Sequence, residues 1–146
     1  MKAPERLSLL DGSLVGGYSE TVQRLKFAAP YCRGRNVLDA GCGTGLGAHY
    51  LAHNGATTAI GVDFSAEAID EAQREFAGET VGFRVGDLQK LDAVLDSSER
   101  FGAIVSFEVL AHLPDPDAFV GATRRLLEPD GVFILSTPNR EAVMAN

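Results

Sequence analysis

The stretch NVLDAGCGTGLG, residues 36–47, joins an apolar run to a glycine-rich turn. Its first half has the β-branched and aliphatic residues of a buried strand. Its second half places Gly41, Gly43 and Gly45 at alternate positions, where glycine lets the backbone turn sharply and approach a ligand closely. Several cofactor-binding folds share this strand and turn, so residues further along the chain must indicate which ligand is held.

Four more runs look like the strand at 36–41, and each ends at a polar residue, a glycine or a proline. Most of them are continuously apolar, which is typical of strands covered on both faces of a parallel sheet. Helical spacing of apolar residues fills the intervals between them. This alternation predicts an α/β fold with a Rossmann-like, doubly wound parallel sheet. The four runs are residues 58–64, 82–87, 101–109 and 131–138.

The helical segments carry recognisable start and stop signals. Ser65 and Asp115 are of the residue types that cap helix N-termini, and Pro116 suits the first position of a helix. Pro30 is expected to close the helix that precedes residue 36. The predicted helices are 18–29, 45–53, 65–76, a weaker one at 88–98 and one from Pro116, and residues 128–131 are predicted to form a turn.

Composition limits the classes of protein that the chain can belong to. It has 146 residues, enough for one domain, with a formal net charge of −7 and an isoelectric point near 4.9. Because no basic run is present, nucleic acid is excluded as the main partner. Cys32 and Cys42 are too few for a disulfide framework, and their spacing is not that of metal ligands.

The sequence also bears on location. Residues 1–13 lack the apolar segment of a secretory signal peptide. No apolar run approaches the roughly 18 residues that a membrane-spanning helix needs. The sequence therefore predicts no membrane span and a place in the reducing cytoplasm.

In open α/β sheets, ligands bind at the carboxyl ends of the strands. The segment GTGLGA, from Gly43, matches the dinucleotide pattern G-x-G-x-x-G/A formally, but it lies two residues too far beyond the strand. Asp63 ends the second strand, about 20 residues after the turn, where a carboxylate can accept both hydroxyl groups of a ribose. Asp87 and Leu88 follow the third strand, where a carboxylate can take the exocyclic amine of adenine and leucine can pack on its ring. A nicotinamide-binding domain has no particular need of Asp87.

Five segments, in this order, resemble the motif set of class I S-adenosylmethionine-dependent methyltransferases. The resemblance is strongest to the small-molecule branch that includes the ubiquinone-type O-methyltransferases, and it extends from about residue 20 to residue 140. It implies an enzyme that transfers a methyl group from S-adenosyl-L-methionine to an oxygen or nitrogen of a small molecule, leaving S-adenosyl-L-homocysteine. The segments are VLDAGCGTG, GVDFS, VGDLQKL, FGAIVSFEVLAHLPDP and LLEPDGVFILSTPN.

The resemblance also implies which residues hold the cofactor. The methionine part would lie against Asp39 and the glycine turn, and the adenosine part against the ends of the second and third strands. In chain order, the implied residues are Arg24 at the methionine end, Asp39, Gly41, Gly43 and Gly45 around the methionine, Asp63 on the ribose, Phe64 beside the adenine, Asp87 and Leu88 on the adenine, and Phe107 through its backbone carbonyl.

Two residues after the fourth strand are candidates for removing a proton from the acceptor. His112 has an ordinary pKa that suits a base near neutral pH, and Glu108 lies at the same end of the sheet. Many relatives read E-x-x-E-H where this chain has EVLAH, so Ala111 replaces a carboxylate. The sequence offers no metal-ligand cluster, and no metal is expected.

The sheet of this family normally has seven strands, the last two forming an antiparallel hairpin, whereas this sequence supplies five. We therefore expect residues 1–17 to be an N-terminal extension and residues 18–146 to be a methyltransferase core whose C-terminal hairpin is missing. Besides the small-molecule acceptor, the expected partner is the remainder of a longer chain or a second copy in a homo-oligomer.

Two other functions remain open at this point. One is a non-catalytic S-adenosylmethionine-binding module, or a methyltransferase-like module that depends on a partner, which Ala111 and the missing strands favour. The other is a nicotinamide-binding domain that uses GTGLGA. The second alternative leaves Asp87 without a purpose.

Overall fold

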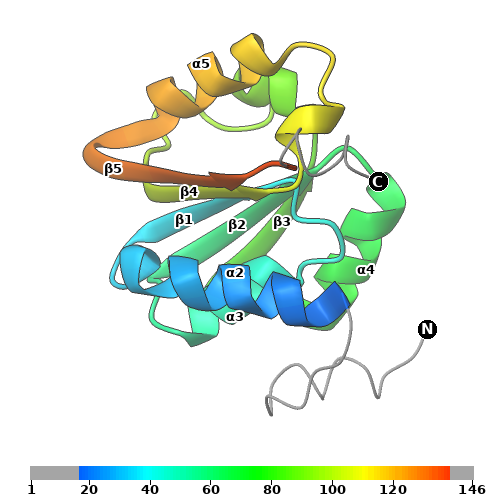
Figure 1. Ribbon diagram of the computed structural model, residues 1–146, viewed down its shortest axis with the longest axis vertical. Coiled ribbons are helices and arrows are strands. Elements are labelled where there is room, and N and C mark those ends of the chain that lie inside the picture. The colour runs from blue at the N-terminus through cyan, green and yellow to red at the C-terminus, as the bar shows by residue number, and fades with distance from the viewer. Residues whose placement is uncertain (1–16, 139–146) are drawn as a thin grey trace.

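The computed structural model describes residues 17–138, which form one sheet with helices on both faces (Figure 1). The sheet has five strands in the order β3-β2-β1-β4-β5, and every pairing is parallel. The predicted Rossmann-like, doubly wound parallel sheet is therefore confirmed. The strands are β1 (Asn36–Ala40), β2 (Thr58–Asp63), β3 (Val81–Val85), β4 (Phe101–Phe107) and β5 (Leu127–Ser136).

The order of the strands fixes where a ligand can bind. From β1 the chain moves outward to β2 and β3, and it then crosses to β4 and β5 on the other side of β1. The direction of winding thus reverses between β1 and β4. A crevice opens at the carboxyl ends of the strands at such a reversal, and ligands of open α/β sheets bind there.

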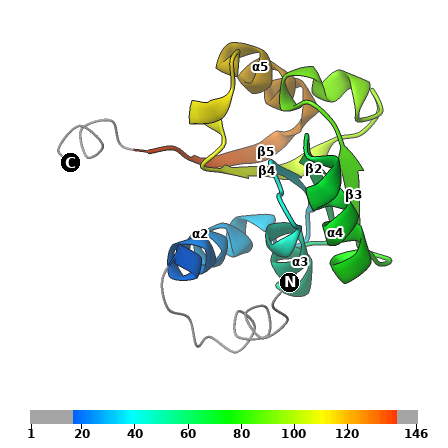
Figure 2. The ribbon, with the colours of Figure 1, turned by 90° about the vertical axis from the view of Figure 1, so that its right-hand side faces the viewer.

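Helices cover the two faces unequally (Figure 2). The helices α2, α3 and α4 pack on one face, and α5 packs with η1 on the other. Each face has its own apolar core. The helices are α2 (Gly17–Cys32), α3 (Leu46–His53), α4 (Ala66–Phe76) and α5 (Pro116–Leu126), with the 3-10 helices η1 (Leu88–Ala93) and η2 (Leu110–His112).

The central strand shows why its sequence is continuously apolar. Val37 and Leu38 are both fully buried but belong to different cores, because successive side chains of a strand point to opposite faces. On the neighbouring strand, Val105 belongs to the first core and Ile104 to the second. A strand covered on both faces has no polar side, so the alternation of an amphipathic strand disappears.

The predicted helix starts are confirmed. The side chain of Ser65 accepts a hydrogen bond from the backbone N–H of Ala68 at 3.2 Å, which caps α4. The side chain of Asp115 accepts one from Ala118 at 3.1 Å, and Pro116 occupies the first turn of α5. These are the interactions expected of N-cap residues.

Several boundaries differ from the prediction. Pro30 lies inside α2, which continues to Cys32. A proline near a helix end removes a single hydrogen bond, and burial of Ala29 and Cys32 against the core holds the last turn in place. The segment at 88–98 forms the shorter 3-10 helix η1, which is kinked at Lys90 with φ −129° and ψ 44°.

The prediction of a turn at residues 128–131 was wrong, because these residues lie within β5. Phe101 pairs with Leu127 and Ala103 pairs with Val132, so the residues between Leu127 and Val132 form an irregularity within β5. Strand β5 thus begins at residue 127, earlier than predicted.

Among residues 17–138, no helix is long and apolar enough to cross a membrane. Of the predicted N-terminal extension, residues 1–17, only the last residue lies within the described part of the chain.

Candidate functional site

A cavity of about 590 Å³ opens at the carboxyl ends of β1, β2, β3 and β4. It is therefore in the crevice that the strand order creates. Seven of the residues singled out from the sequence line it: Gly41, Asp63, Phe64, Asp87, Leu88, Glu108 and His112. The other five singled-out residues do not line the cavity: Arg24, Asp39, Gly43, Gly45 and Phe107.

The glycine turn between β1 and α3 needs glycine for two different reasons. Gly41, Gly43 and Gly45 have φ values of 87°, 53° and 95°, which L side chains rarely adopt. A side chain on Gly45 would lie 2.7 Å from the ring of Phe83, so Gly45 is required by packing. A side chain on Gly43 would meet no atom within 4 Å, so the space beside Gly43 is open. Gly45 faces the core and Gly43 leaves room for a ligand.

The carboxylate of Asp63 holds this turn in position. Its Oδ2 atom accepts a hydrogen bond from the backbone N–H of Gly43 at 2.9 Å. Its Oδ1 atom accepts one from the backbone N–H of Ser65 at 3.0 Å. The end of β2 is thus joined to the turn after β1 and to the start of α4. Each carboxylate oxygen can accept a further hydrogen bond, which leaves Asp63 able to bind hydroxyl groups in the cavity.

Asp39 lies beneath the turn and is buried. The pKa of its carboxyl group is raised to about 7, chiefly by burial and secondly by the neighbouring Asp63 carboxylate, against a hydrogen bond from the backbone N–H of Ala48 that lowers it. A cation bound close by would favour the ionised form of Asp39. Asp39 therefore contributes to the site as a buried carboxyl group at the N-terminal end of α3.

The end of β3 presents a carboxylate beside an apolar side chain. Asp87 is exposed, and its Oδ1 atom accepts hydrogen bonds from the backbone N–H and the side-chain amide of Gln89, at 2.9 and 3.2 Å. These hydrogen bonds lower the pKa of the Asp87 carboxyl group. Leu88 is buried and Phe64 is 80% exposed, and both line the cavity. Leu88 and Phe64 thus give this end of the cavity apolar surface beside the Asp87 carboxylate.

Glu108, directly after β4, has a φ of 58°, the one positive value at a non-glycine position among residues 17–138. A left-handed backbone costs an ordinary residue roughly 1–2 kcal/mol. Strand β4 ends just before Glu108, at Phe107, two residues earlier than predicted. Its Oε1 atom accepts a hydrogen bond from Arg24 Nη2 at 3.0 Å, across 84 positions of sequence. Arg24 also lies 3.5 Å from Glu20. Arg24 thus reaches the site through Glu108.

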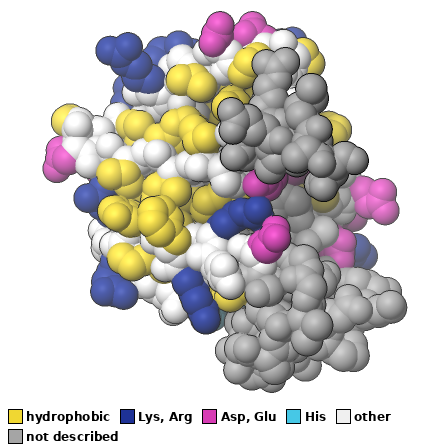
Figure 3. Space-filling view, in the orientation of Figure 1, with side chains coloured by type: hydrophobic (Ala, Val, Ile, Leu, Met, Phe, Trp, Pro, Cys, Tyr) yellow, Lys and Arg dark blue, Asp and Glu magenta, His cyan; other side chains and the backbone are white. Residues whose placement is uncertain are grey.

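Phe107 and Arg24 do not line the main cavity. They line a second hollow of about 390 Å³ between α2 and β5. Hydrophobic side chains gather on this face of the molecule (Figure 3), where Phe27 and Leu135 are 63% and 40% exposed. Glu108, which lines the main cavity, is hydrogen-bonded to Arg24 and so joins the two hollows.

His112 lies exposed in η2 and lines the cavity close to Glu108 in sequence. The remaining lining residues are ones that sequence reasoning missed. The side chain of Gln89 donates a hydrogen bond to Asp87 and accepts one from the backbone N–H of Asp115 at 2.6 Å. Sequence reasoning missed Gln89 because the contact with Asp115 joins residues that are distant in sequence. The apolar segment around His112 supplies the others, Val109, Leu113 and Pro114.

The charged groups of the cavity share one sign. Asp63, Asp87 and Glu108 line it, and its described lining contains no lysine or arginine. Carboxylates at the ends of three neighbouring strands favour hydrogen-bond donors and cations and oppose anionic groups.

Comparison with known proteins identifies the family of the chain. The chain belongs to the family described as the methyltransferase domain, which matches residues 17–145.

Two curated relatives illustrate the likeness. A protein of Mycolicibacterium smegmatis named "Probable S-adenosylmethionine-dependent methyltransferase" is 39% identical over 112 residues, which cover 75% of this chain and 40% of that protein. A ubiquinone biosynthesis O-methyltransferase of Actinobacillus pleuropneumoniae is 35% identical over 111 residues, covering 73% of this chain and 47% of that protein. The chain thus spans less than half the length of either relative.

Solved structures share the fold. A protein from Pyrococcus horikoshii superposes with a TM-score of 0.75 at 26% identity, covering 90% of this chain and 63% of that one. A TehB-like SAM-dependent methyltransferase from Corynebacterium glutamicum gives a TM-score of 0.67 at 28% identity, covering 89% and 66%.

The two roles of glycine in the turn can be separated by substitution. Gly45→Ala should lower the free energy of unfolding by about 2–4 kcal/mol, because the new methyl group overlaps Phe83 and Ala72. Gly43→Ala should cost only about 1 kcal/mol, since it meets a backbone penalty and no neighbour. Urea unfolding of both variants measures the difference, and equal losses would contradict the assignment of Gly45 to the core.

The buried carboxyl group of Asp39 should make stability depend on pH. Between about pH 4 and pH 7 the folded chain keeps a proton that the unfolded chain has lost, so the free energy of unfolding falls as pH rises through this range. The upper limit of this fall is roughly 4 kcal/mol, because the pKa differs by about three units between the folded and unfolded chains and each unit is worth about 1.4 kcal/mol.

The variant Asp39→Asn keeps an acceptor for Ala48 and cannot ionise. Urea unfolding at pH 5 and pH 8 should show a much smaller fall for the variant than for the unmodified chain. If the two proteins lose stability equally over this interval, Asp39 is not the group responsible.

Proposed function

We propose that the chain binds S-adenosyl-L-methionine in the main cavity, and that the protein transfers the methyl group to an oxygen or nitrogen of a small-molecule acceptor. The observation that carries the proposal is the row of carboxylates, Asp87, Asp63 and Glu108, at the ends of β3, β2 and β4. S-adenosylmethionine offers an amine, two ribose hydroxyl groups, a sulfonium and an ammonium group, and all of these suit carboxylates. The names of the two curated relatives support the same choice of cofactor.

The same row argues against a nicotinamide dinucleotide. Its pyrophosphate is anionic and would have to lie among carboxylates, without an arginine or lysine in the described lining. Dinucleotide sites instead hold the pyrophosphate at a helix N-terminus with a glycine in the matching register. The GTGLGA segment lacks that register.

The residues present fit the proposed cofactor. The space beside Gly43 is open, so no neighbouring atom blocks the approach of a ligand to the turn there. Asp63 keeps unused acceptor capacity on both oxygens and so can take two hydroxyl groups. Leu88 and Phe64 offer apolar surface on two sides of the adenine position, and Asp87 offers an oxygen to its amine.

When bound, the cofactor would supply a methyl group activated by a sulfonium: as the acceptor attacks in line, the carbon–sulfur bond would break and its electron pair would stay on the sulfur of S-adenosylhomocysteine. The protein's part is to orient the acceptor and to exclude water, which Val109, Leu113 and Pro114 do as apolar lining. An acceptor O–H or N–H must lose a proton as the bond from carbon to oxygen or nitrogen forms. In our proposal this proton goes to the His112 imidazole, which lines the cavity, because the other candidate, the Glu108 carboxylate, is already paired with Arg24.

The activity and the acceptor are proposals for the whole protein, because this chain spans under half the length of the curated relatives cited. The relative named ubiquinone biosynthesis O-methyltransferase supports an oxygen as the acceptor atom. A cytoplasmic location belongs to the same proposal and agrees with the two cysteines, Cys32 and Cys42, being free thiols.

Calorimetric titration tests the choice of cofactor. The chain should bind S-adenosylhomocysteine saturably and should give no signal with NAD at the same concentration. Binding of NAD alone would contradict the proposal and would favour the dinucleotide alternative. Binding of S-adenosylhomocysteine without methyl transfer to any acceptor by the full-length protein would favour a non-catalytic module.

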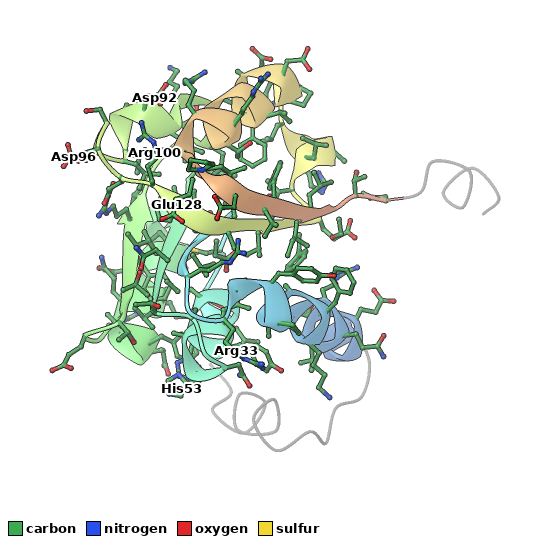
Figure 4. All side chains as sticks on the ribbon, turned by 90° about the vertical axis from the view of Figure 1, so that its left-hand side faces the viewer. Arg33, His53, Asp92, Asp96, Arg100 and Glu128 are labelled. Carbon is green, nitrogen blue, oxygen red and sulfur yellow. The ribbon has the colours of Figure 1, made fainter. Side chains whose placement is uncertain are left out.

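The adenine end can be tested by Asp87→Asn. The hydrogen bonds from Gln89 hold the amide oxygen, so the amide NH₂ would face the adenine amine, and two donors would then meet. Affinity for S-adenosylhomocysteine should fall about tenfold, as expected for the loss of one hydrogen bond to a charged group. The matched control is Asp96→Asn, at the periphery of the molecule and away from the cavity (Figure 4). Equal affinities of the two variants would remove Asp87 from the site.

A further inference from the structure

Three elements meet at Glu108. Its backbone N–H donates a hydrogen bond to the carbonyl oxygen of Ser136, with 3.0 Å between nitrogen and oxygen. The same nitrogen lies 3.2 Å from the Ser136 hydroxyl oxygen. The Ser136 hydroxyl donates to Glu108 Oε1 at 3.3 Å, and Arg24 from α2 donates to the same atom at 3.0 Å. Glu108, Ser136 and Arg24 thus tie together the end of β4, the end of β5 and α2. We call these three residues the Glu108 clamp.

The clamp fixes both the backbone and the side chain of Glu108. Its left-handed backbone, at φ 58°, is unfavourable for glutamate and persists because the surrounding contacts hold it. Oε1 has two donors, whereas the structure assigns Oε2 no partner among residues 17–138. The carboxylate, which lines the cavity, is therefore half satisfied and keeps one oxygen for a ligand.

The strand order indicates which part of a ligand comes to Glu108. Across the sheet, the cavity residues follow as Asp87 after β3, Asp63 at β2, Gly41 after β1 and Glu108 after β4. With adenine at Asp87 and ribose at Asp63, a ligand that continues in the same direction brings its amino-acid end to Gly41 and Glu108. An ammonium group there would find the free carboxylate oxygen.

We infer that Glu108 binds the α-ammonium group of the cofactor's amino-acid end, and that Ser136 is the positioning residue that orients the carboxylate for it. This inference rests on the proposed cofactor and goes further, because it assigns a role to Ser136. Ser136 lines the second hollow and not the cavity, so it acts through Glu108. Removing its hydroxyl leaves Arg24 as the single donor of the clamp to Oε1, so the carboxylate is oriented by one hydrogen bond in place of two. The backbone carbonyl of Ser136 still accepts the Glu108 N–H.

Two ligands isolate the amino-acid end. S-adenosylhomocysteine carries it, and 5′-methylthioadenosine has the same adenosine and thioether but ends in a methyl group. Ser136→Ala should weaken binding of S-adenosylhomocysteine about fivefold and change that of 5′-methylthioadenosine less than twofold, as expected for a charge-assisted hydrogen bond that has lost its geometry. Glu108→Gln should weaken S-adenosylhomocysteine about tenfold and spare the shorter ligand.

Two further variants separate positioning from folding. Ser136→Thr keeps the hydroxyl at a position that lines the second hollow, and its affinity for S-adenosylhomocysteine should be within about twofold of that of the unmodified chain. The double variant Ser136→Ala with Glu108→Gln should bind no more weakly than Glu108→Gln alone, since Ser136 acts through Glu108. Ser98→Ala, at an exposed serine, is the control and should change neither affinity.

The outcomes distinguish this inference from the proposed function. If Ser136→Ala weakens both ligands equally, or if Ser136→Thr fails to rescue, the serine supports the fold alone and the inference is overturned. If the unmodified chain binds both ligands with equal affinity, Glu108 does not bind the amino-acid end and the inference is overturned. If it binds neither ligand, the proposed cofactor is wrong and the inference falls with it.

Discussion

The site depends on one carboxylate that joins three segments of the chain. Asp63, the last residue of β2, accepts backbone N–H groups from Gly43 in the glycine turn and from Ser65 at the start of α4. Hydrogen bonds to a charged acceptor contribute roughly 1.5–3 kcal/mol each. The parallel pairing of β1 with β2 brings the turn and the carboxylate to the same edge of the sheet. A ligand that binds Asp63 is therefore bound to the element that shapes the cavity.

The cavity shows how a common fold acquires a particular preference. The glycine turn and the strand order are shared by several cofactor-binding proteins, and they leave the choice of cofactor open. Charge narrows that choice, because the acidic residues at the ends of β2, β3 and β4 favour a ligand with donors and positive groups along its length. Asp39, buried beneath the turn, adds a carboxyl group whose pKa is raised to about 7 by burial, and which a nearby cation would ionise.

Much of this was predictable because the signals are local. Continuous apolar runs predicted strands covered on both faces, and Ser65 and Asp115 were predicted as caps from their positions alone. The details that escaped prediction depend on residues distant in sequence. The hydroxyl of Ser136 meets Glu108 across 28 positions, and Arg24 meets it across 84. Neither pairing leaves a periodic pattern in the sequence.

The most direct test of the account is a crystal structure of this chain with S-adenosylhomocysteine. The account predicts both ribose hydroxyl groups within hydrogen-bond distance of the Asp63 carboxylate, the adenine between Leu88 and Phe64, and the turn at Gly43 unchanged. A ligand whose ribose lies away from Asp63, or a turn that has left the Asp63 carboxylate, would contradict the claim that one carboxylate both shapes the site and binds the cofactor.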